Sequence, residues 1–340
     1  MTSSSTPQPL LEVQDLRIRL RTHRGPADAV RGVSFTMARG DTVGLVGESG
    51  SGKSITALAL MGLLPDDAVV QGSIRLDGRE LVGLPEAALC KLRGNRVAMV
   101  FQEPMTALNP VHTIGRQVAE PMRLHRGLGA SAARADAIAL LDRVGIPDAA
   151  RRFDAYPHQF SGGQRQRITI AMALACSPDL LIADEPTTAL DATLQQQILA
   201  LIRELVRERG MGLLLISHDL GVIAQNTARM LVMYGGSVAE RGPAAAVLAR
   251  PLHPYTRGLL AARPRFGAGE RGRRLPTIPG TVPELADLPP GCPFAGRCAW
   301  TADACHTTVP PAERPAADRE VRCLRLAELP APDTTANAAA

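Results

Sequence analysis

Apolar and polar positions alternate over the first part of the chain. Leu11–Leu20 and Val30–Met37 both show this alternation, which predicts strands with one face toward a core and one toward water. Later apolar runs are short and continuous, as in Leu213–Ser217, and predict further strands. Other runs of this kind are Asp41–Val46, Leu180–Ala183 and Arg229–Met233. Helical spacing occurs in Ser54–Leu64, Arg134–Val144 and Ala192–Arg209.

Strands that alternate with helices predict an α/β fold with a parallel sheet. The 340 residues correspond to about two domains, or to one domain with an extension. We expect a loose tail at 1–10, a main domain at 11–262, an extension at 263–330 and a second tail at 331–340. The Ala-rich stretch 103–178 predicts a helical subdomain inside the main domain, and Pro, Gly and Arg dominate the extension.

A glycine-rich segment follows the predicted strand at Asp41–Val46. It has the Walker A pattern G-x-x-x-x-G-K-[ST], and its residues are Gly47, Glu48, Ser49, Gly50, Ser51, Gly52, Lys53 and Ser54. In such a loop the backbone N–H groups surround phosphate oxygens, and the following helix presents its positive end. Lys53 would bridge the β- and γ-phosphates of ATP, and the Ser54 hydroxyl would bind Mg²⁺. The chain has only two lysines, so a lysine at this place argues against a glycine turn without function.

An apolar strand that ends in two acidic residues supplies the second half of the predicted site. Leu180–Ala183 is followed by Asp184 and Glu185, which is the Walker B pattern. Asp184 would hold Mg²⁺, and Glu185 would act as the general base on the attacking water. Two adjacent carboxylates also occur in solvated turns, so this interpretation depends on the phosphate loop.

A third segment, Phe160–Arg167, precedes a predicted helix and places glycines at its start. Ser161 is the predicted N-cap, and a helix N-terminus of this kind can meet an anion. Ser161, Gly162, Gly163 and Gln164 resemble the signature motif LSGGQ of the ATP-binding cassette (ABC) superfamily. Other pieces agree in order and spacing: Gln102 resembles the Q-loop glutamine, Asp191 in Ala189–Asp191 the D-loop aspartate, and His218 the switch histidine.

This resemblance implies an ABC ATPase, a P-loop NTPase with an N-terminal antiparallel β-subdomain, a RecA-like parallel core and a helical signature subdomain. It implies a head-to-tail dimer, in which Ser161–Gln164 of one subunit meets ATP held by the phosphate loop of the other. The implied catalytic residues are Glu185, His218 and Gln102, and the implied Mg²⁺ ligands are Ser54, Gln102 and Asp184. One departure is that Arg17–Val30 lacks the aromatic residue that stacks on adenine in most cassettes.

Further segments resemble the ATPases of oligopeptide and dipeptide importers. These segments are Phe101–Pro110, Tyr156–Phe160, Ala183–Asp191, His253–Thr256 and Cys292–Cys298, although Asp is commoner than Glu at position 103. The resemblance implies two permease subunits, a second ATPase that is a paralogue, and an extracytoplasmic solute-binding protein. It places the chain peripherally on the cytoplasmic face of the membrane. Nickel and other small-solute importers share this type of subunit, so the solute stays open.

A soluble nucleic-acid ATPase with a cassette head is the competing class. Such proteins insert a long coiled coil between Q-loop and signature, whereas 58 residues without sustained heptads separate Gln102 from Ser161. The net charge is +5, but the arginines are dispersed and aromatic residues make up only 3%, which disfavours base stacking. The densest basic cluster, Arg263–Arg274, is interpreted as a solvated linker or a contact to anionic lipid or a permease. We therefore expect no nucleic-acid partner.

Four of the six cysteines lie near the end of the chain: Cys292, Cys298, Cys305 and Cys323. Their spacings include no tight C-x₂₋₄-C pair, which structural zinc sites usually have, and structural disulfides are rare in the cytosol. Four thiolates in a Pro- and Gly-rich segment can hold an iron–sulfur cluster. The four positions resemble the ligands of a [4Fe–4S] cluster in some peptide-importer ATPases. Zinc, free thiols and disulfides stay open as alternatives.

Overall fold

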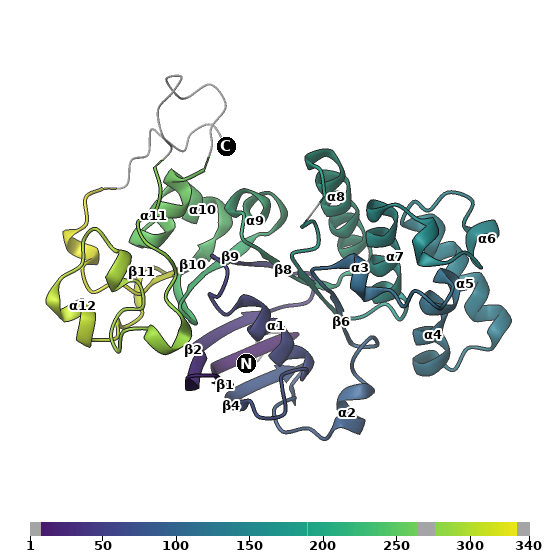
Figure 1. Ribbon diagram of the computed structural model, residues 1–340, viewed down its shortest axis with the longest axis horizontal. Helices are drawn as coiled ribbons and strands as arrows, with labels where there is room; N and C mark the ends of the chain where they lie inside the picture. Colours follow the sequence, from purple (N-terminus) through teal and green to yellow (C-terminus); the bar gives the residue numbers. More distant parts are fainter. Residues whose placement is uncertain (1–7, 189, 264–275, 332–340) are drawn as a thin grey trace, which may run out of the picture.

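Two sheets organise the chain in the computed structural model, which describes residues 8–188, 190–263 and 276–331. The smaller sheet is antiparallel and has the strand order β2-β1-β4-β5. Its strands are β1 (Leu11–Thr22), β2 (Gly25–Met37), β4 (Val69–Leu76) and β5 (Arg79–Glu80). The alternating residues of β1 and β2 therefore form the expected N-terminal antiparallel sheet, drawn in purple and blue in Figure 1.

The larger sheet has a parallel centre and an antiparallel flank, in the order β11-β12-β10-β9-β3-β8-β7-β6. Its parallel strands are β3 (Thr42–Val46), β6 (Val97–Val100), β7 (Leu180–Asp184), β8 (Gly212–Ser217) and β9 (Arg229–Tyr234). Its antiparallel strands are β10 (Ser237–Pro243), β11 (Glu313–Ala316) and β12 (Arg319–Val321). The carboxyl ends of the parallel strands share one edge, where α/β sheets bind ligands.

Both faces of the parallel strands are covered, which explains why their sequences are apolar without alternation. Leu214 and Ile216 of β8 pack into a core shared with β1, β2 and helix α1 (Lys53–Met61). Leu213 and Leu215 point to the other face, into a second core shared with the helical part of the chain. The sheet thus separates two hydrophobic cores and fixes the loops at its carboxyl edge.

Helices of the middle segment form one end of the molecule, and the last part of the chain forms the opposite end (Figure 1). The middle helices are α3 (Pro104–Ala107), α4 (Ile114–Arg126), α5 (Ala130–Arg143), α6 (Ala149–Arg152) and α7 (Gly162–Leu174). The other helices are α1 (Lys53–Met61), α2 (Glu86–Cys90), α8 (Ala192–Arg209), α9 (Leu220–Asn226), α10 (Ala244–Ala249), α11 (Pro254–Ala261) and α12 (Asp303–Thr307). None of the described helices combines the length and the apolar character needed to span a bilayer.

The C-terminal segment 276–331 joins the main sheet, which its composition did not indicate. Strand β12 pairs with β10, and Arg319 of β12 forms an ion pair with Glu240 of β10, which is fully buried. The backbone N–H groups of Leu252 and His253 also donate to that carboxylate. A polar strand is therefore buried because its charges are paired, so the hydrophobic pattern gives no signal for it.

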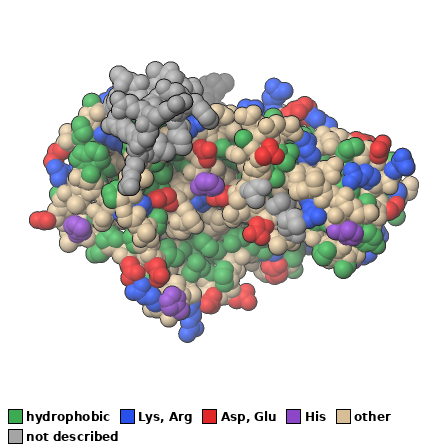
Figure 2. Space-filling view, turned by 45° about the horizontal axis from the view of Figure 1, so that its top comes forward, with side chains coloured by type: hydrophobic (Ala, Val, Ile, Leu, Met, Phe, Trp, Pro, Cys, Tyr) green, Lys and Arg blue, Asp and Glu red, His purple; other side chains and the backbone are tan. Residues whose placement is uncertain are grey.

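Charged side chains of both signs intersperse over the face of the molecule shown in Figure 2. Many of the arginines take part in ion pairs, such as Arg96 with Asp179 and Arg229 with Asp41. The tail 332–340 and most of the predicted tail at 1–10 and of the cluster Arg263–Arg274 lie outside the described residues.

Candidate ATP site

The phosphate loop connects β3 to α1 at the carboxyl edge of the parallel sheet. Gly52 caps α1 with a φ of 98°, a left-handed conformation that favours glycine. A Cβ on Gly47 would lie 2.2 Å from the carbonyl oxygen of Met233, so only glycine lets the loop pack against β9. Ser49 and Gly50 are exposed at the tip of the loop. The loop thus combines close backbone packing with an accessible tip.

Lys53 is buried inside the loop and bonds to the loop's own backbone. Its Nζ donates to the carbonyl oxygens of Gly47 at 2.7 Å and Glu48 at 2.9 Å. Burial lowers the pKa of Lys53, and the carboxylates of Glu185, Asp184 and Glu48 partly offset this effect. Phosphate oxygens would be stronger partners for this ammonium group than the neutral carbonyls, because they carry negative charge.

Glu185 is the point where the predicted catalytic residues meet. Its Oε2 accepts from Gln102 Nε2 at 3.3 Å and lies 3.2 Å from Nδ1 of His218. These residues follow three neighbouring strands, β6, β7 and β8. Thr188 also donates to the same oxygen at 2.9 Å, a contact for which no separate sequence signal was found. Three side chains thus orient the carboxylate of Glu185, a residue whose backbone has a positive φ of 46°.

Asp184 fits a role as a metal ligand. Asp184 is only 4% exposed, and its Oδ1 has no hydrogen-bond partner among the described residues. Burial raises the pKa of Asp184, while a hydrogen bond with Ser54 lowers it. A buried oxygen without a partner is unfavourable, and a divalent cation beside Ser54 would satisfy it. The third expected Mg²⁺ ligand, Gln102, donates to Glu185 here through its amide nitrogen.

The predicted signature residues cap helix α7. Ser161 Oγ accepts from the backbone N–H of Gln164 at 3.3 Å, and the Gln164 side chain accepts from the N–H of Ser161 at 3.2 Å. Gly162 is exposed, whereas a Cβ on Gly163 would lie 2.5 Å from the side chain of Leu194 in α8. The helix end is thus capped and packed against α8, and within the described residues no hydrogen bond joins it to the chain's own phosphate loop.

The D-loop aspartate caps helix α8. Asp191 accepts from the backbone N–H of Leu194 at 2.9 Å and is exposed. Ala189 of the same segment lies outside the described residues.

The four late cysteines line one pocket, together with Phe294 and Trp300. All four are free thiols, and burial raises the pKa of Cys292 to about 11. As the side chains lie, however, no group of three or more His, Cys, Asp or Glu in the described residues could hold a metal ion. The predicted [4Fe–4S] ligand set is therefore not supported by these side-chain positions. The four thiols share a pocket, but they are not arranged to coordinate a metal.

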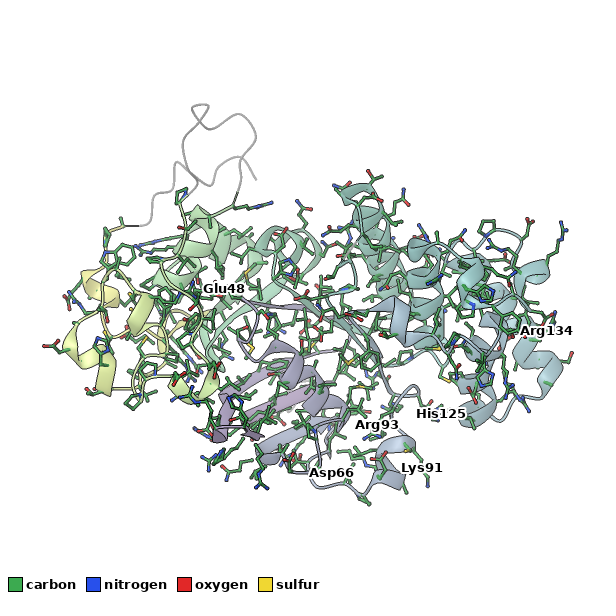
Figure 3. All side chains as sticks on the ribbon, in the orientation of Figure 1. Glu48, Asp66, Lys91, Arg93, His125 and Arg134 are labelled. Carbon is green, nitrogen blue, oxygen red and sulfur yellow. The ribbon has the colours of Figure 1, made fainter. Side chains whose placement is uncertain are left out.

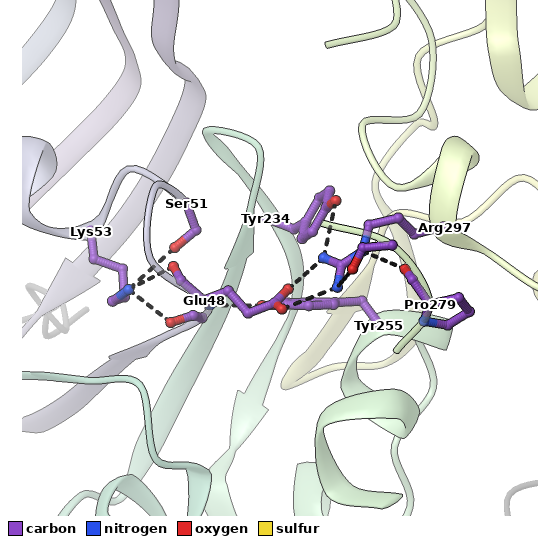
Figure 4. A network of polar contacts seen from close by, with 9 residues as sticks. Glu48, Ser51, Lys53, Tyr234, Tyr255, Pro279 and Arg297 are labelled. Carbon is purple, nitrogen blue, oxygen red and sulfur yellow. Dashed lines mark hydrogen bonds and ion pairs between the residues drawn. The ribbon is translucent and has the colours of Figure 1, made fainter. Parts of the chain in front are cut away.

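Two contacts of Glu48 were not indicated by the sequence. Figure 3 places Glu48 in the middle of the molecule, on the side that faces the C-terminal segment, whereas Arg134 lies in the helical part. The backbone N–H of Glu48 donates to Tyr255 Oη, and the Glu48 carboxylate pairs with Arg297 (Figure 4).

A parallel sheet, a glycine loop after β3 and two adjacent acids at the carboxyl end of β7 define the class as a P-loop ATPase.

Comparison with known proteins identifies the family. The family described as ABC transporter matches residues 30–188, and the C-terminal region of the oligopeptide/dipeptide transporter family matches residues 239–305. A "Putative peptide import ATP-binding protein" of Brucella melitensis is 51% identical, over 95% of this chain and 99% of that one. A Brucella abortus protein of the same description is 53% identical, over 90% and 92%.

Solved structures agree with this assignment. A dimeric ATP-binding cassette bound to ADP and phosphate in a post-hydrolysis state has a TM-score of 0.62 and 27% identity, over 69% of this chain and 98% of that one. The cbiO1 protein of Clostridium perfringens, part of the ABC transporter complex cbiONQ, has a TM-score of 0.60 and 26% identity, over 71% and 91%. The chain belongs to the ABC transporter ATPases, in the family with the oligopeptide/dipeptide transporter C-terminal region.

The two aspartates at the ends of β7 should respond oppositely to neutralisation. The folded pKa of Asp184 is raised, so its ionised form destabilises the fold above that pKa, and Asp184→Asn should not lower the melting temperature. Burial alone would raise the pKa of Asp179, but hydrogen bonds from Arg96 and Arg39 lower it overall. Its stabilising effect is present above the unfolded pKa, so Asp179→Asn should lower the melting temperature at pH 7.

Thermal unfolding without nucleotide measures this difference in melting temperature. A second melt with Mg²⁺ and ATP measures how much the ligands stabilise each variant. Asp184→Asn should lose most of the Mg²⁺-dependent stabilisation, whereas Asp179→Asn should keep it. An Asp184→Asn protein that melts several degrees below wild type would contradict this account of the buried carboxylate.

Proposed function

We propose that this chain binds and hydrolyses ATP to power the import of dipeptides or oligopeptides across the cytoplasmic membrane. The observation that carries the proposal is the combination, in one chain, of a convergent ATPase site with the oligopeptide/dipeptide transporter C-terminal region. The names of the Brucella relatives favour peptides as the solute. Import of nickel or another small solute is the alternative. A nucleic-acid role is disfavoured because acidic and basic side chains are mixed on the face shown in Figure 2.

In the proposed mechanism Glu185 accepts a proton from the attacking water while Gln102 and His218 hold its carboxylate in position. Lys53 and the N–H groups of the phosphate loop bind the phosphates, and the backbone donors need no reorganisation during the reaction. Ser54, Asp184 and Gln102 would hold Mg²⁺, which when bound neutralises phosphate charge. The chain thus supplies the base, its positioning groups and the anion-binding loop.

A second ATPase subunit completes each site in this proposal. Ser161–Gln164 form a capped helix end that can serve the ATP of a partner in a head-to-tail dimer. Gly163 of this end lies against Leu194, whose N–H donates to Asp191. We infer that the partner is a paralogue and that both ATPases lie on the cytoplasmic face, bound to two permease subunits. An extracytoplasmic binding protein would deliver the solute to those permeases.

The four late cysteines are proposed to hold a [4Fe–4S] cluster with a structural role. The support is their convergence on one pocket in a segment that has few apolar residues to hold its shape. Small changes of side-chain rotamer would have to bring the thiols together. Structural zinc and free thiols remain the alternatives.

The complex with its permeases and binding protein, in proteoliposomes, tests the function. ATP hydrolysis should rise when di- or oligopeptide is present with the binding protein. Glu185→Gln should bind ATP but hydrolyse it about 10²–10⁴ times more slowly, because the general base is gone. Stimulation by Ni²⁺ and not by peptide would favour the alternative solute, and stimulation by nucleic acid alone would overturn the importer assignment.

Iron content and tryptophan emission test the cysteine proposal. Anaerobically purified protein should be brown and contain about four irons per chain. Removal of the iron should increase the emission of Trp300, the only tryptophan, which lines the same pocket. Cys298→Ser should lose iron, whereas Cys90→Ser, at an exposed cysteine elsewhere, should keep it. Colourless protein, or stoichiometric zinc, would rule the cluster out.

A further inference from the structure

A buried arginine of the C-terminal segment reaches into the phosphate loop. Arg297 Nη1 lies 2.7 Å from Glu48 Oε2, and Nη2 lies 3.1 Å from Oε1 (Figure 4). The Arg297 side chain is only 6% exposed and that of Glu48 is 30% exposed. A bidentate pair with this degree of burial is fixed in direction and poorly screened by salt. The loop is therefore joined to a segment almost 250 residues later in the chain.

Arg297 is itself held from several sides. Its Nε donates to the carbonyl oxygen of Pro279 at 2.9 Å, and its guanidinium lies 5.8 Å from the centre of the Tyr234 ring. Longer hydrogen bonds of 3.4 Å reach the carbonyl of Gly280 and the hydroxyl of Tyr234. These contacts hold the Arg297 guanidinium in the orientation in which it pairs with Glu48.

The other polar groups of Glu48 are also occupied. Its N–H donates to Tyr255 Oη at 2.8 Å, and Tyr255 is fully buried edge-on against Tyr234. Its carbonyl accepts from Lys53, and it also accepts from the N–H of Ser51 at 3.2 Å. The N–H, the carbonyl oxygen and the carboxylate of Glu48 therefore all have partners, in the turn that precedes Lys53.

The charge of Glu48 poses a problem for a loop that binds a polyanion. Burial lowers the pKa of Lys53, and the Glu48 carboxylate is close enough to offset part of this effect, together with Glu185 and Asp184. Without its arginine, this carboxylate would repel phosphate and compete with it for the lysine ammonium. Arg297 neutralises the carboxylate and keeps it turned toward the C-terminal segment.

We propose that Arg297 is a positioning residue for ATP, which holds Glu48 and neutralises it so that the phosphate loop stays shaped for the triphosphate. The proposal rests on the proposed ATP site and adds that the C-terminal segment takes part in nucleotide affinity. Arg297 need not touch the nucleotide, because its effect passes through Glu48.

Equilibrium binding of a fluorescent ATP analogue with Mg²⁺ to the full chain tests the proposal. Arg297→Ala should weaken binding about tenfold or more, since it leaves a partly buried charge without its partner. Arg297→Lys keeps the charge but loses the bidentate geometry, and should be intermediate. Adding Glu48→Gln to Arg297→Ala removes the unpaired charge and should recover much of the affinity. A role confined to general stability would make the loss and recovery of affinity follow the melting temperature, so binding is measured well below the melting temperature of every variant.

The matched control is Arg241→Ala, which breaks another ion pair between the main sheet and the C-terminal segment, with Glu320. It should bind the analogue within about twofold of wild type, because neither partner contacts the phosphate loop. In the transport complex Arg297→Ala should raise KM for ATP more than it lowers kcat. Melting curves for each variant confirm that it is folded.

Three results would overturn the positioning role. The first is unchanged analogue binding by both Arg297→Ala and Arg297→Lys. The second is an equal loss of binding in Arg241→Ala, and the third is no recovery when Glu48→Gln is added to Arg297→Ala. Lys53→Ala separates this failure from failure of the ATP site. If Lys53→Ala binds as wild type does, the proposed site itself is wrong; if it loses binding while the Arg297 variants do not, only the present inference fails.

Discussion

Three carboxylates surround the place proposed for a triphosphate, and the way in which each is compensated determines the rest of the site. Glu48 is paired with Arg297, and Glu185 is held by Gln102, Thr188 and His218. Asp184 keeps one buried oxygen without a partner among the described residues, which suits a divalent cation. Arg297 thus neutralises Glu48, hydrogen bonds orient Glu185, and Asp184 is left for a metal. This arrangement reduces the repulsion that a bound triphosphate would meet.

The fold brings these compensating groups together from distant parts of the chain. Parallel strands β3, β6, β7 and β8 end at one edge and deliver the phosphate loop, the glutamine, the two acids and the histidine. The C-terminal segment reaches the same region from the other end of the sheet, because β12 pairs with β10 through a buried Arg319–Glu240 pair. The extension is therefore part of the structural support of the site.

Local patterns predicted four of the five parallel strands and the phosphate loop, because both depend on residues close in sequence; strand β6 was not predicted. Helix α1 ends at Met61, earlier than its apolar spacing suggested, because Gly62 takes a left-handed φ of 61° and caps it. Strand β12 was not predicted, since its buried side chains are charged. Arg297 could be noticed only as part of the Cys292–Cys298 segment. Its partner is far away in sequence, and such a contact leaves no local periodicity.

A structure of the chain with Mg²⁺ and a non-hydrolysable ATP analogue tests most directly whether charge compensation organises the site. The account predicts that Lys53 Nζ leaves the carbonyls of Gly47 and Glu48 for phosphate oxygens, that Asp184 Oδ1 faces the metal, and that Glu48 stays paired with Arg297. A nucleotide bound elsewhere, with Lys53 still on the two carbonyls, would contradict it. So would a Glu48 carboxylate released from Arg297 and turned toward the phosphates.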